Sequence, residues 1–279
     1  PETAKLASSL PIETIASIVD EMEPDKAADL LGDLPEEQAR AVLARLDDPE
    51  DVRPLLIHPD DSAGGLMTSE FLALRPLMTA QEAVEALRRW SPDSDEIYYL
   101  FVANEKKQLC GVVNLRQLIL AGDNTLIKNI MNADVISVKV GVDQEDCART
   151  MAHYDLSAIP VVDEDGIIVG VITYDDIVDV LEEEATEDVY RLANISDNEL
   201  DPDSSITEQL KGRLPWLYLS TITAFFGAWV ISNFEQVIAQ AAVLALFQSV
   251  VAGQGGNTAS QIIAMTVRTL ATERISAKS

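Results

Sequence analysis

The residues of this chain best suited to chemistry are carboxylates crowded between positions 175 and 188. Four of them lie three or four residues apart, which places them on one face of a helix: Asp176, Asp179, Glu183 and Glu187. Mg²⁺ prefers oxygen ligands and gives up its water reluctantly, so paired carboxylates that hold a hydrated ion suit it. A solvated acidic helix face has the same pattern. The residues alone favour the solvated face and leave a metal site as the alternative.

Crowded carboxylates also carry repulsion that a cation can relieve. Two of them ~6 Å apart repel by ~3 kcal/mol at an effective dielectric constant of about 20, and by less when they are exposed. A few such pairs across a domain interface reach the ~5.5 kcal/mol that moves a two-state equilibrium from 1:99 to 99:1. A divalent cation bound there would hold the domains together.

The charge balance excludes one class of partner and divides the chain. Among 279 residues, 47 are acidic and 20 are basic, which gives a net charge of −27. Residues 1–212 carry a net charge of −29, whereas residues 213–279 contain only six charged residues. Nucleic-acid binding needs clustered cations, so no nucleic-acid partner is expected. The two cysteines, Cys110 and Cys147, are too few for a disulfide framework and fit a reducing compartment.

Patterns typical of enzymes are missing from the sequence. It has no phosphate-binding Gly-x-x-x-x-Gly-Lys loop, no Gly-x-Ser-x-Gly and no Cys-x-x-Cys. His58 and His153 have no partners at metal-ligand spacing, so we expect surface or core histidines. We therefore expect no catalytic residues and no enzymatic activity.

Two uncharged runs predict a membrane part. Leu214–Phe234 has no ionisable charge, and a helix of this length rises ~1.5 Å per residue to span ~30 Å, the thickness of a bilayer's hydrocarbon core. The second run is Gln236–Val267, with an apolar centre at Val237–Gly253. Buried helices of a large soluble protein are the alternative, more so for the second run because it contains glutamines.

The charges that flank these runs predict an orientation. Lysines and arginines precede the first run and follow the second, and the charge between them is Glu235. The positive-inside rule then places both outer flanks in the cytoplasm. We expect a multi-pass protein of the cell membrane, in contact with lipid, with residues 1–212 cytoplasmic.

Residues 1–57 predict short helices punctuated by proline. Apolar-periodic segments follow three prolines, at Ile12–Met22, Asp25–Leu34 and Glu36–Leu46. Such short helices cannot bury an apolar face alone, so we expect them to stack as a small superhelix. The chain begins at Pro1 without a signal-peptide pattern, and we expect it to be a fragment of a longer parent.

Residues 67–180 contain an internal duplication of about 60 residues. Gly111-Val112-Val113 recurs as Gly170-Val171-Ile172, and Met67-Thr68 recurs as Met131-Asn132. Each copy predicts a short lead strand, a helix, a strand, a turn, a strand and a helix. Asp163-Glu164-Asp165-Gly166 between two β-branched runs is a hairpin signal, because glycine supplies a positive φ.

At these residues the duplication resembles a tandem pair of CBS domains. The matching segments are Pro160–Asp163 and Gly170–Asp176. Such pairs form regulatory modules that often bind adenosine nucleotides, so ATP enters as an expected ligand. The resemblance implies a nucleotide site at Tyr99, Arg116, Thr173 and Asp176. Gln117 departs from the acidic residue expected in the first repeat, and Asp176 cannot freely serve both ribose and metal.

The order of the segments resembles the MgtE family of magnesium channels. The matching motifs are Ala63–Thr68 before the first repeat, Glu183–Asp188 after the second, and Gly255–Thr258 at the end of the second predicted span. The resemblance implies that Mg²⁺ is both transported and sensed, in a homodimer. It covers nearly the whole chain, but the family has five membrane helices and a longer helical domain, so its pore aspartate is absent here.

The resemblance assigns roles to individual residues. It implies Mg²⁺ ligands on a connecting helix and on the two domains facing it: Asp25, Asp29, Glu145, Asp155, Asp176, Asp179, Glu184, Glu187 and Asp188. It implies a pore lined by Gly255, Gly256 and Asn257, where the second span should end in non-helical backbone. The helix Asp188–Arg213 should act as the gate, broken or kinked at Pro202.

The predicted fold is multidomain: an α-helical superhelix fragment, an α/β tandem CBS pair, a connecting helix and two transmembrane α-helices. The expected domains are residues 1–60 (helical), 61–127 and 128–187 (CBS), 188–212 (connecting plug helix) and 213–279 (membrane). The alternative function is a membrane-anchored CBS nucleotide sensor without a pore. A cyclin M type transporter is a third possibility. The order of the segments in this chain argues against it, because that type has its membrane part before the CBS repeats.

Overall fold

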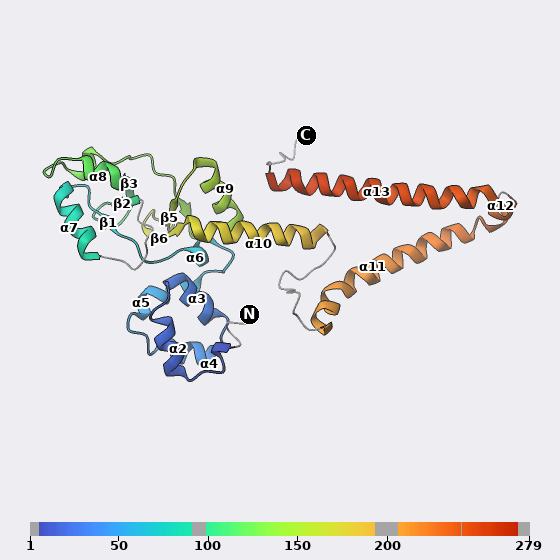
Figure 1. The fold of residues 1–279 in the computed structure, drawn as a ribbon, viewed down its shortest axis with the longest axis horizontal. Helices are drawn as coiled ribbons and strands as arrows, with labels where there is room; N and C mark the ends of the chain where they lie inside the picture. The colour runs from blue at the N-terminus through green and yellow to red at the C-terminus, as the bar shows by residue number, and fades with distance from the viewer. Residues whose placement is uncertain (1–5, 91–98, 193–205, 241, 273–279) are drawn as a thin grey trace. The chain divides into compact units, whose positions relative to one another are not determined.

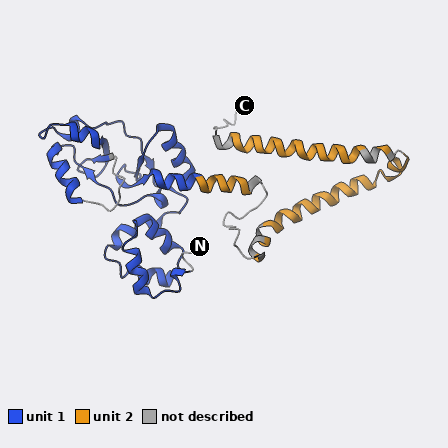
Figure 2. Cartoon of the chain, in the orientation of Figure 1, with its two compact units in different colours: residues 1–181 blue, residues 182–279 orange. Residues whose placement is uncertain are grey.

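The computed structural model describes residues 6–90, 99–192, 206–240 and 242–272 (Figure 1). The chain divides into two compact units, Pro1–Leu181 and Glu182–Ser279 (Figure 2). The first unit contains the helical segment and both repeats. The second contains the C-terminal part of one long helix and the helices that follow it.

From Ile12 onward, the N-terminal segment folds as four short helices and a 3₁₀ turn. These are α2 (Ile12–Val19), α3 (Pro24–Gly32), α4 (Glu36–Leu43), α5 (Pro49–Val52) and η1 (Leu55–Ile57). The three predicted helices are present, and each ends two or three residues earlier than the apolar pattern suggested. A proline precedes each of these helices or is its first residue. Proline lacks a backbone N–H, and at the start of a helix no hydrogen bond is lost because the first N–H groups have no intrahelical partner.

The duplication is confirmed by two sheets of identical topology. The first sheet has strands β1 (Ala73–Leu74), β2 (Tyr99–Ala103) and β3 (Leu109–Asn114), with helices α7 (Ala80–Trp90) and α8 (Leu115–Leu120). The second has β4 (Val138–Lys139), β5 (Ala158–Val162) and β6 (Ile168–Thr173), with α9 (Gln144–Tyr154) and α10 (Tyr174–Leu192). In each sheet the first pair is parallel and the second antiparallel. A short 3₁₀ turn, η2 (Ile127–Asn129), lies between the copies.

The two repeats exchange their lead segments. Thr68, ahead of the first repeat, bridges to Val171 of the second, and Asn132, ahead of the second, bridges to Val112 of the first. Each exchange seats a methionine against a strand glycine: a Cβ at Gly170 would lie 2.5 Å from the sulfur of Met67. The repeats are therefore tied to each other by backbone pairing, not only by side-chain packing.

The hairpin turns of the two repeats use the same backbone with different residues. Lys107 and Asp155 are the two non-glycine residues with positive φ in the part of the chain that the structure describes. Lys107 has φ 61° in the first hairpin, and Gly166 has φ 78° at the matching place in the second. Glycine adopts this region without strain, whereas a lysine does not.

Lys107→Gly is expected to keep or raise the stability of the full chain. The left-handed conformation costs a lysine roughly 1–2 kcal/mol, and the extra unfolded-state entropy of glycine removes about 0.5–1 kcal/mol of that gain. The matched control is Lys106→Gly, which has no such strain to relieve and should be destabilising. Thermal unfolding in detergent measures both variants. A larger loss of stability for Lys107→Gly than for the control would contradict the strain account.

Buried side chains fill two main cores in the first unit. One continuous cluster contains residues of the helical segment, such as Ile15 and Leu31, together with Cys147, Ile159 and Ile172 of the second repeat. The first repeat has a core of its own. The helical segment is therefore packed onto the second repeat through a short helix between them, α6 (Ala63–Leu66).

Three helices follow in the second unit after residues 193–205, which lie outside the described residues together with the predicted break at Pro202. These helices are α11 (Ile206–Ser232), α12 (Glu235–Gln240) and α13 (Ala242–Thr272). Within the described ranges, one stretch, Arg213–Ser232 in α11, is long and apolar enough to cross a membrane by length and composition. It overlaps the first predicted span, and the second predicted span is not found by the same criterion.

The predicted non-helical end of the second span is wrong. Gly255, Gly256 and Asn257 lie in the middle of α13, which continues to Thr272. Each glycine in a helix interior destabilises the helix by about 1 kcal/mol relative to alanine, whereas an unsatisfied backbone group in lipid costs several kcal/mol. Helical hydrogen bonding therefore outweighs the preference of glycine for irregular backbone.

Candidate metal-sensing junction

The helical segment meets the second repeat at two carboxylates. Asp25 lies in the first turn of α3 and is buried, with 7% of its surface exposed. Asp176 lies in the first turn of α10 and is half-buried. The Thr173 hydroxyl, at the end of β6, donates to Asp176 Oδ2 at 2.6 Å and also lies against Asp175. We call the region around Asp25 and Asp176 the junction.

The junction disfavours two negative charges. Burial, together with the nearby charge of Asp176, raises the pKa of Asp25 to about 7. Burial also raises the pKa of Asp176, against the lowering effect of its hydrogen bond from Thr173. Two carboxylates that resist joint ionisation form a place where a cation gains binding energy. This donor set fits a hydrated Mg²⁺ ion.

A lysine stands beside this pair. Lys26 follows Asp25 on α3, and its Nζ lies 2.5 Å from Glu23 Oε2. The hydrogen bond with Glu23 raises the pKa of Lys26, and the charges of Asp176 and Asp25 act in the same direction. Sequence analysis missed Lys26 and Glu23, although their place next to Asp25 on one helix turn was the available signal.

Three other predicted ligands of the first unit are exposed. Asp29, one helical turn after Asp25, and Asp179, three residues after Asp176, are both exposed. Asp155 is exposed and ends α9 in the left-handed conformation, with φ 52° and ψ 46°. Among the described residues, Asp155 does not form a metal-binding cluster with Asp25 and Asp176.

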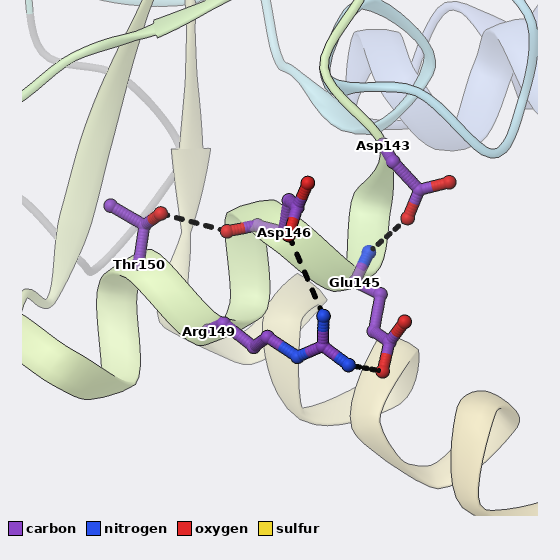
Figure 3. Close-up of polar contacts among 5 residues, drawn as sticks. All are labelled: Asp143, Glu145, Asp146, Arg149 and Thr150. Carbon is purple, nitrogen blue, oxygen red and sulfur yellow. Dashed lines mark hydrogen bonds and ion pairs between the residues drawn. The ribbon is translucent and has the colours of Figure 1, made fainter. Parts of the chain in front are cut away.

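Glu145 has a protein partner (Figure 3). Arg149, one turn further along α9, forms an ion pair with Glu145, and its other terminal nitrogen lies 3.6 Å from Asp146 Oδ1. Asp143 caps the same helix by accepting the Glu145 N–H at 2.9 Å. A cation at Glu145 would therefore share this carboxylate with Arg149. The i, i+4 spacing of the two residues was the signal that could have predicted the pair.

The remaining predicted ligands lie in the C-terminal part of α10. Glu184, Glu187 and Asp188 are half-buried and belong to the second unit, as does the end of that helix. Within the residues that the structure describes, no three His, Cys, Asp or Glu side chains approach closely enough to hold a metal ion together.

The predicted nucleotide residues occupy matching places in the two repeats. Asn114 pairs with Tyr99 in the first sheet as Thr173 pairs with Ala158 in the second. Arg116 is exposed at the start of α8. Gln117 accepts the Asn114 N–H at 3.1 Å, so it closes a helix cap where the second repeat has Asp176. The side chain of Tyr99 lies outside the described residues.

Comparisons with known proteins agree on the family. The MgtE intracellular N domain model matches residues 1–61, and the CBS domain model matches residues 63–124 and 127–183. The magnesium transporter MgtE of Thermus thermophilus is 41% identical over 223 residues, which cover 80% of this chain and 50% of that protein. This chain spans about half the length of the curated relatives it matches.

Two solved structures resemble the first unit. The soluble part of a magnesium transporter matches with a TM-score of 0.62 at 38% identity, covering 66% of this chain and 72% of that one. The cytosolic domain of the Mg²⁺ channel MgtE in complex with ATP matches with a TM-score of 0.57 at 38% identity, covering 64% and 80%. These matches confirm a helical N domain followed by a tandem CBS pair.

Proposed function

This chain belongs to the MgtE family of magnesium transporters, and from that premise we propose that it senses cytosolic Mg²⁺ and forms part of a channel for the same ion. The three relatives that match about 80% of this chain are named as magnesium transporters. The observation that carries the proposal is the junction, where the charge of half-buried Asp176 in the second repeat raises the pKa of buried Asp25 in the helical domain.

The mechanism follows from repulsion and its relief. When Asp25 and Asp176 are both ionised, they push the helical domain away from the second repeat. A hydrated Mg²⁺ between them removes that repulsion and favours the closed arrangement. Lys26 supplies a weaker, permanent positive charge at the same place. This control is allosteric because Mg²⁺ binds the closed state more tightly than the open one.

The start of α10 connects this equilibrium to the membrane part. Asp176 and Asp179 lie on the same helix, α10, as Glu184, Glu187 and Asp188. We assign the gate to the segment 188–212, and the membrane part to residues 213–279. High internal Mg²⁺ then closes the channel, which limits uptake of the ion by negative feedback.

The remaining parts of the proposal concern architecture. We propose domains at residues 1–60, 61–127 and 128–187, with α11 and α13 as two spans of a multi-pass protein of the cell membrane. The first 212 residues face the cytoplasm and the protein acts as a homodimer in lipid. Gly255, Gly256 and Asn257, all exposed on α13, are assigned to the pore. The lack of bulk at two successive positions supports this assignment.

A nucleotide-sensing function is the second candidate. The matched cytosolic domain of the Mg²⁺ channel MgtE is a complex with ATP, and the resemblance to CBS pairs implies Thr173 and Asp176 as nucleotide residues of this chain. In this chain the Thr173 hydroxyl already donates to Asp176. ATP binding at Thr173 would therefore compete with the hydrogen bond that orients the junction carboxylate.

Limited trypsin digestion of the full chain separates the two functions. Lys26 lies at the junction, so Mg²⁺ at millimolar concentration is expected to slow cleavage after Lys26 when ionic strength is matched with KCl. Cleavage after Arg88 in α7 of the first repeat is the internal control and should not change. Protection by ATP without Mg²⁺ would favour the nucleotide sensor. Equal cleavage after Lys26 in all conditions would contradict the Mg²⁺ sensor.

A further inference from the structure

The segment between the helical domain and the first repeat folds back on itself. We call His58–Leu66 the joint. Ser62, which is buried, donates its hydroxyl to Pro59 O at 2.6 Å and accepts the Gly65 N–H at 3.3 Å. The fold-back brings residues 58–60 against the first turn of α6.

Two glycines make that approach possible. A Cβ at Gly64 would lie 2.4 Å from Cγ of the His58 ring, and a Cβ at Gly65 would lie 2.4 Å from Pro59 O and 2.7 Å from Asp60 Cα. Neither glycine has a positive φ, so the requirement concerns space and not backbone conformation. A Cβ at Gly64 would collide with the His58 side chain, whereas a Cβ at Gly65 would collide with the backbone of Pro59 and Asp60.

The joint is anchored to the second repeat at its far end. Ala63 N–H donates to Val142 O at 2.7 Å, and Gly64 N–H donates to Val140 O at 2.9 Å. Thr68 then exchanges two backbone hydrogen bonds with Val171 of β6, at 2.8 and 3.0 Å. β6, the strand that pairs with Thr68 just after the joint, leads directly into α10, the helix that carries Asp176.

The near end of the joint belongs to the helical domain. Leu55 of η1 is buried, and η1 packs against α3, the helix that carries Asp25. Both carboxylates of the junction are thus tied to β6: Asp176 through α10, and Asp25 through α3, η1 and the joint. The shape of the joint consequently decides where Asp25 lies relative to Asp176.

We propose that Gly64 and Gly65 are positioning residues of the Mg²⁺ sensor, because their missing side chains let the joint fold tightly enough to hold Asp25 opposite Asp176. The inference rests on the proposed function for its Mg²⁺ dependence. Its structural part, the tight fold of the joint, stands without Mg²⁺.

The two glycines provide a test that separates positioning from general folding. Gly64→Ala collides with the His58 side chain, so removing that side chain in His58→Gly/Gly64→Ala should restore the joint. Gly65→Ala collides with backbone, so His58→Gly should not restore it. The matched control is Gly141→Ala. Gly141 lies between Val140 and Val142, whose carbonyls accept the hydrogen bonds of the joint, but a Cβ there would meet no described atom within 4 Å.

Two measurements on the full chain in detergent give the outcome. The first is the Mg²⁺ concentration that half-protects the bond after Lys26 from trypsin. If Gly65→Ala lowers the docked population to about a tenth, this concentration rises about tenfold. The second is hydrogen exchange of the Ala63 and Gly64 amides without Mg²⁺, which should be faster in Gly65→Ala and in Gly64→Ala than in wild type or Gly141→Ala.

Several results would overturn the proposal. Gly65→Ala with wild-type exchange and a wild-type Mg²⁺ midpoint would show that the joint tolerates the added carbon. If Gly65→Ala does not fold, the test rests on Gly64→Ala and the double variant His58→Gly/Gly64→Ala. A double variant whose exchange rates and Mg²⁺ midpoint stay like those of Gly64→Ala would contradict the positioning role. If Mg²⁺ does not change cleavage after Lys26 in the wild-type chain, the proposed function is wrong. The hydrogen-exchange rates of the Ala63 and Gly64 amides then still test the proposed fold of the joint.

Discussion

Replacing five carboxylates of α10 by their amides is expected to leave a channel that no longer closes as internal Mg²⁺ rises. The substituted residues are Asp176, Asp179, Glu184, Glu187 and Asp188. Amides keep the size of each side chain while removing both the repulsion and the ligand charge. Closing from 1:99 to 99:1 requires ~5.5 kcal/mol of differential Mg²⁺ binding, and a few carboxylate pairs supply it. Without them, Mg²⁺ has no preference for the closed state.

Mg²⁺ flux into vesicles measures this effect in a protein that has the full length of the curated relatives. A control variant removes the same number of charges from exposed acids outside the proposed site: Glu37, Asp47, Asp48, Glu105 and Asp123. The control should close with the wild-type Mg²⁺ dependence. If the α10 variant also closes normally, the sensor lies elsewhere and the proposed ligand set is wrong.

Asp25→Asn is expected to change the pH dependence of stability. The pKa of Asp25 is about 7 in the folded chain and 3.8 is its ordinary value, so the folded state binds more protons than the unfolded state between these limits. The free energy of unfolding therefore falls as pH rises through this window, by at most about 1.4 kcal/mol per pH unit. Above pH 7 the ionised carboxylate is a standing cost, which asparagine removes.

Thermal unfolding of the full chain in detergent, at pH 5.5 and at pH 8 without Mg²⁺, tests this prediction. Wild type should lose more stability between the two pH values than Asp25→Asn. At pH 8, added Mg²⁺ should stabilise wild type more than the variant, because the ion binds the ionised carboxylate. The same pH slope in both proteins would mean that Asp25 is not the group that titrates.

The fold of the first unit could be predicted because its patterns are local and repeated. The prolines ahead of α2, α3 and α4 mark helix starts, and the duplication gave the strand and helix order of both repeats. The hairpin at Gly166 was predicted from glycine's freedom to adopt positive φ. Lys107 adopts the same positive φ, which is unfavourable for a lysine. This conformation could be predicted only by aligning the first hairpin with the second.

The junction could be predicted only in part. A resemblance supplied Asp25 and Asp176, but their burial and the lysine beside them depend on how the helical domain packs on the second repeat. The space around Gly65 depends on how the nine-residue joint, His58–Leu66, folds back, and no periodicity in the sequence predicts this. In α13 the local preference of glycine pointed to a break, and continuous helical hydrogen bonding prevailed.

Direct Mg²⁺ binding tests the central claim that the ion bridges Asp25 and Asp176. The measurement is equilibrium dialysis of Mg²⁺ against the full chain at pH 8 in KCl, where both carboxylates are available to a cation. The account predicts saturable binding by wild type and at least one bound ion fewer in the double variant Asp25→Asn/Asp176→Asn. The same number of bound ions at the same midpoint in both proteins would contradict it.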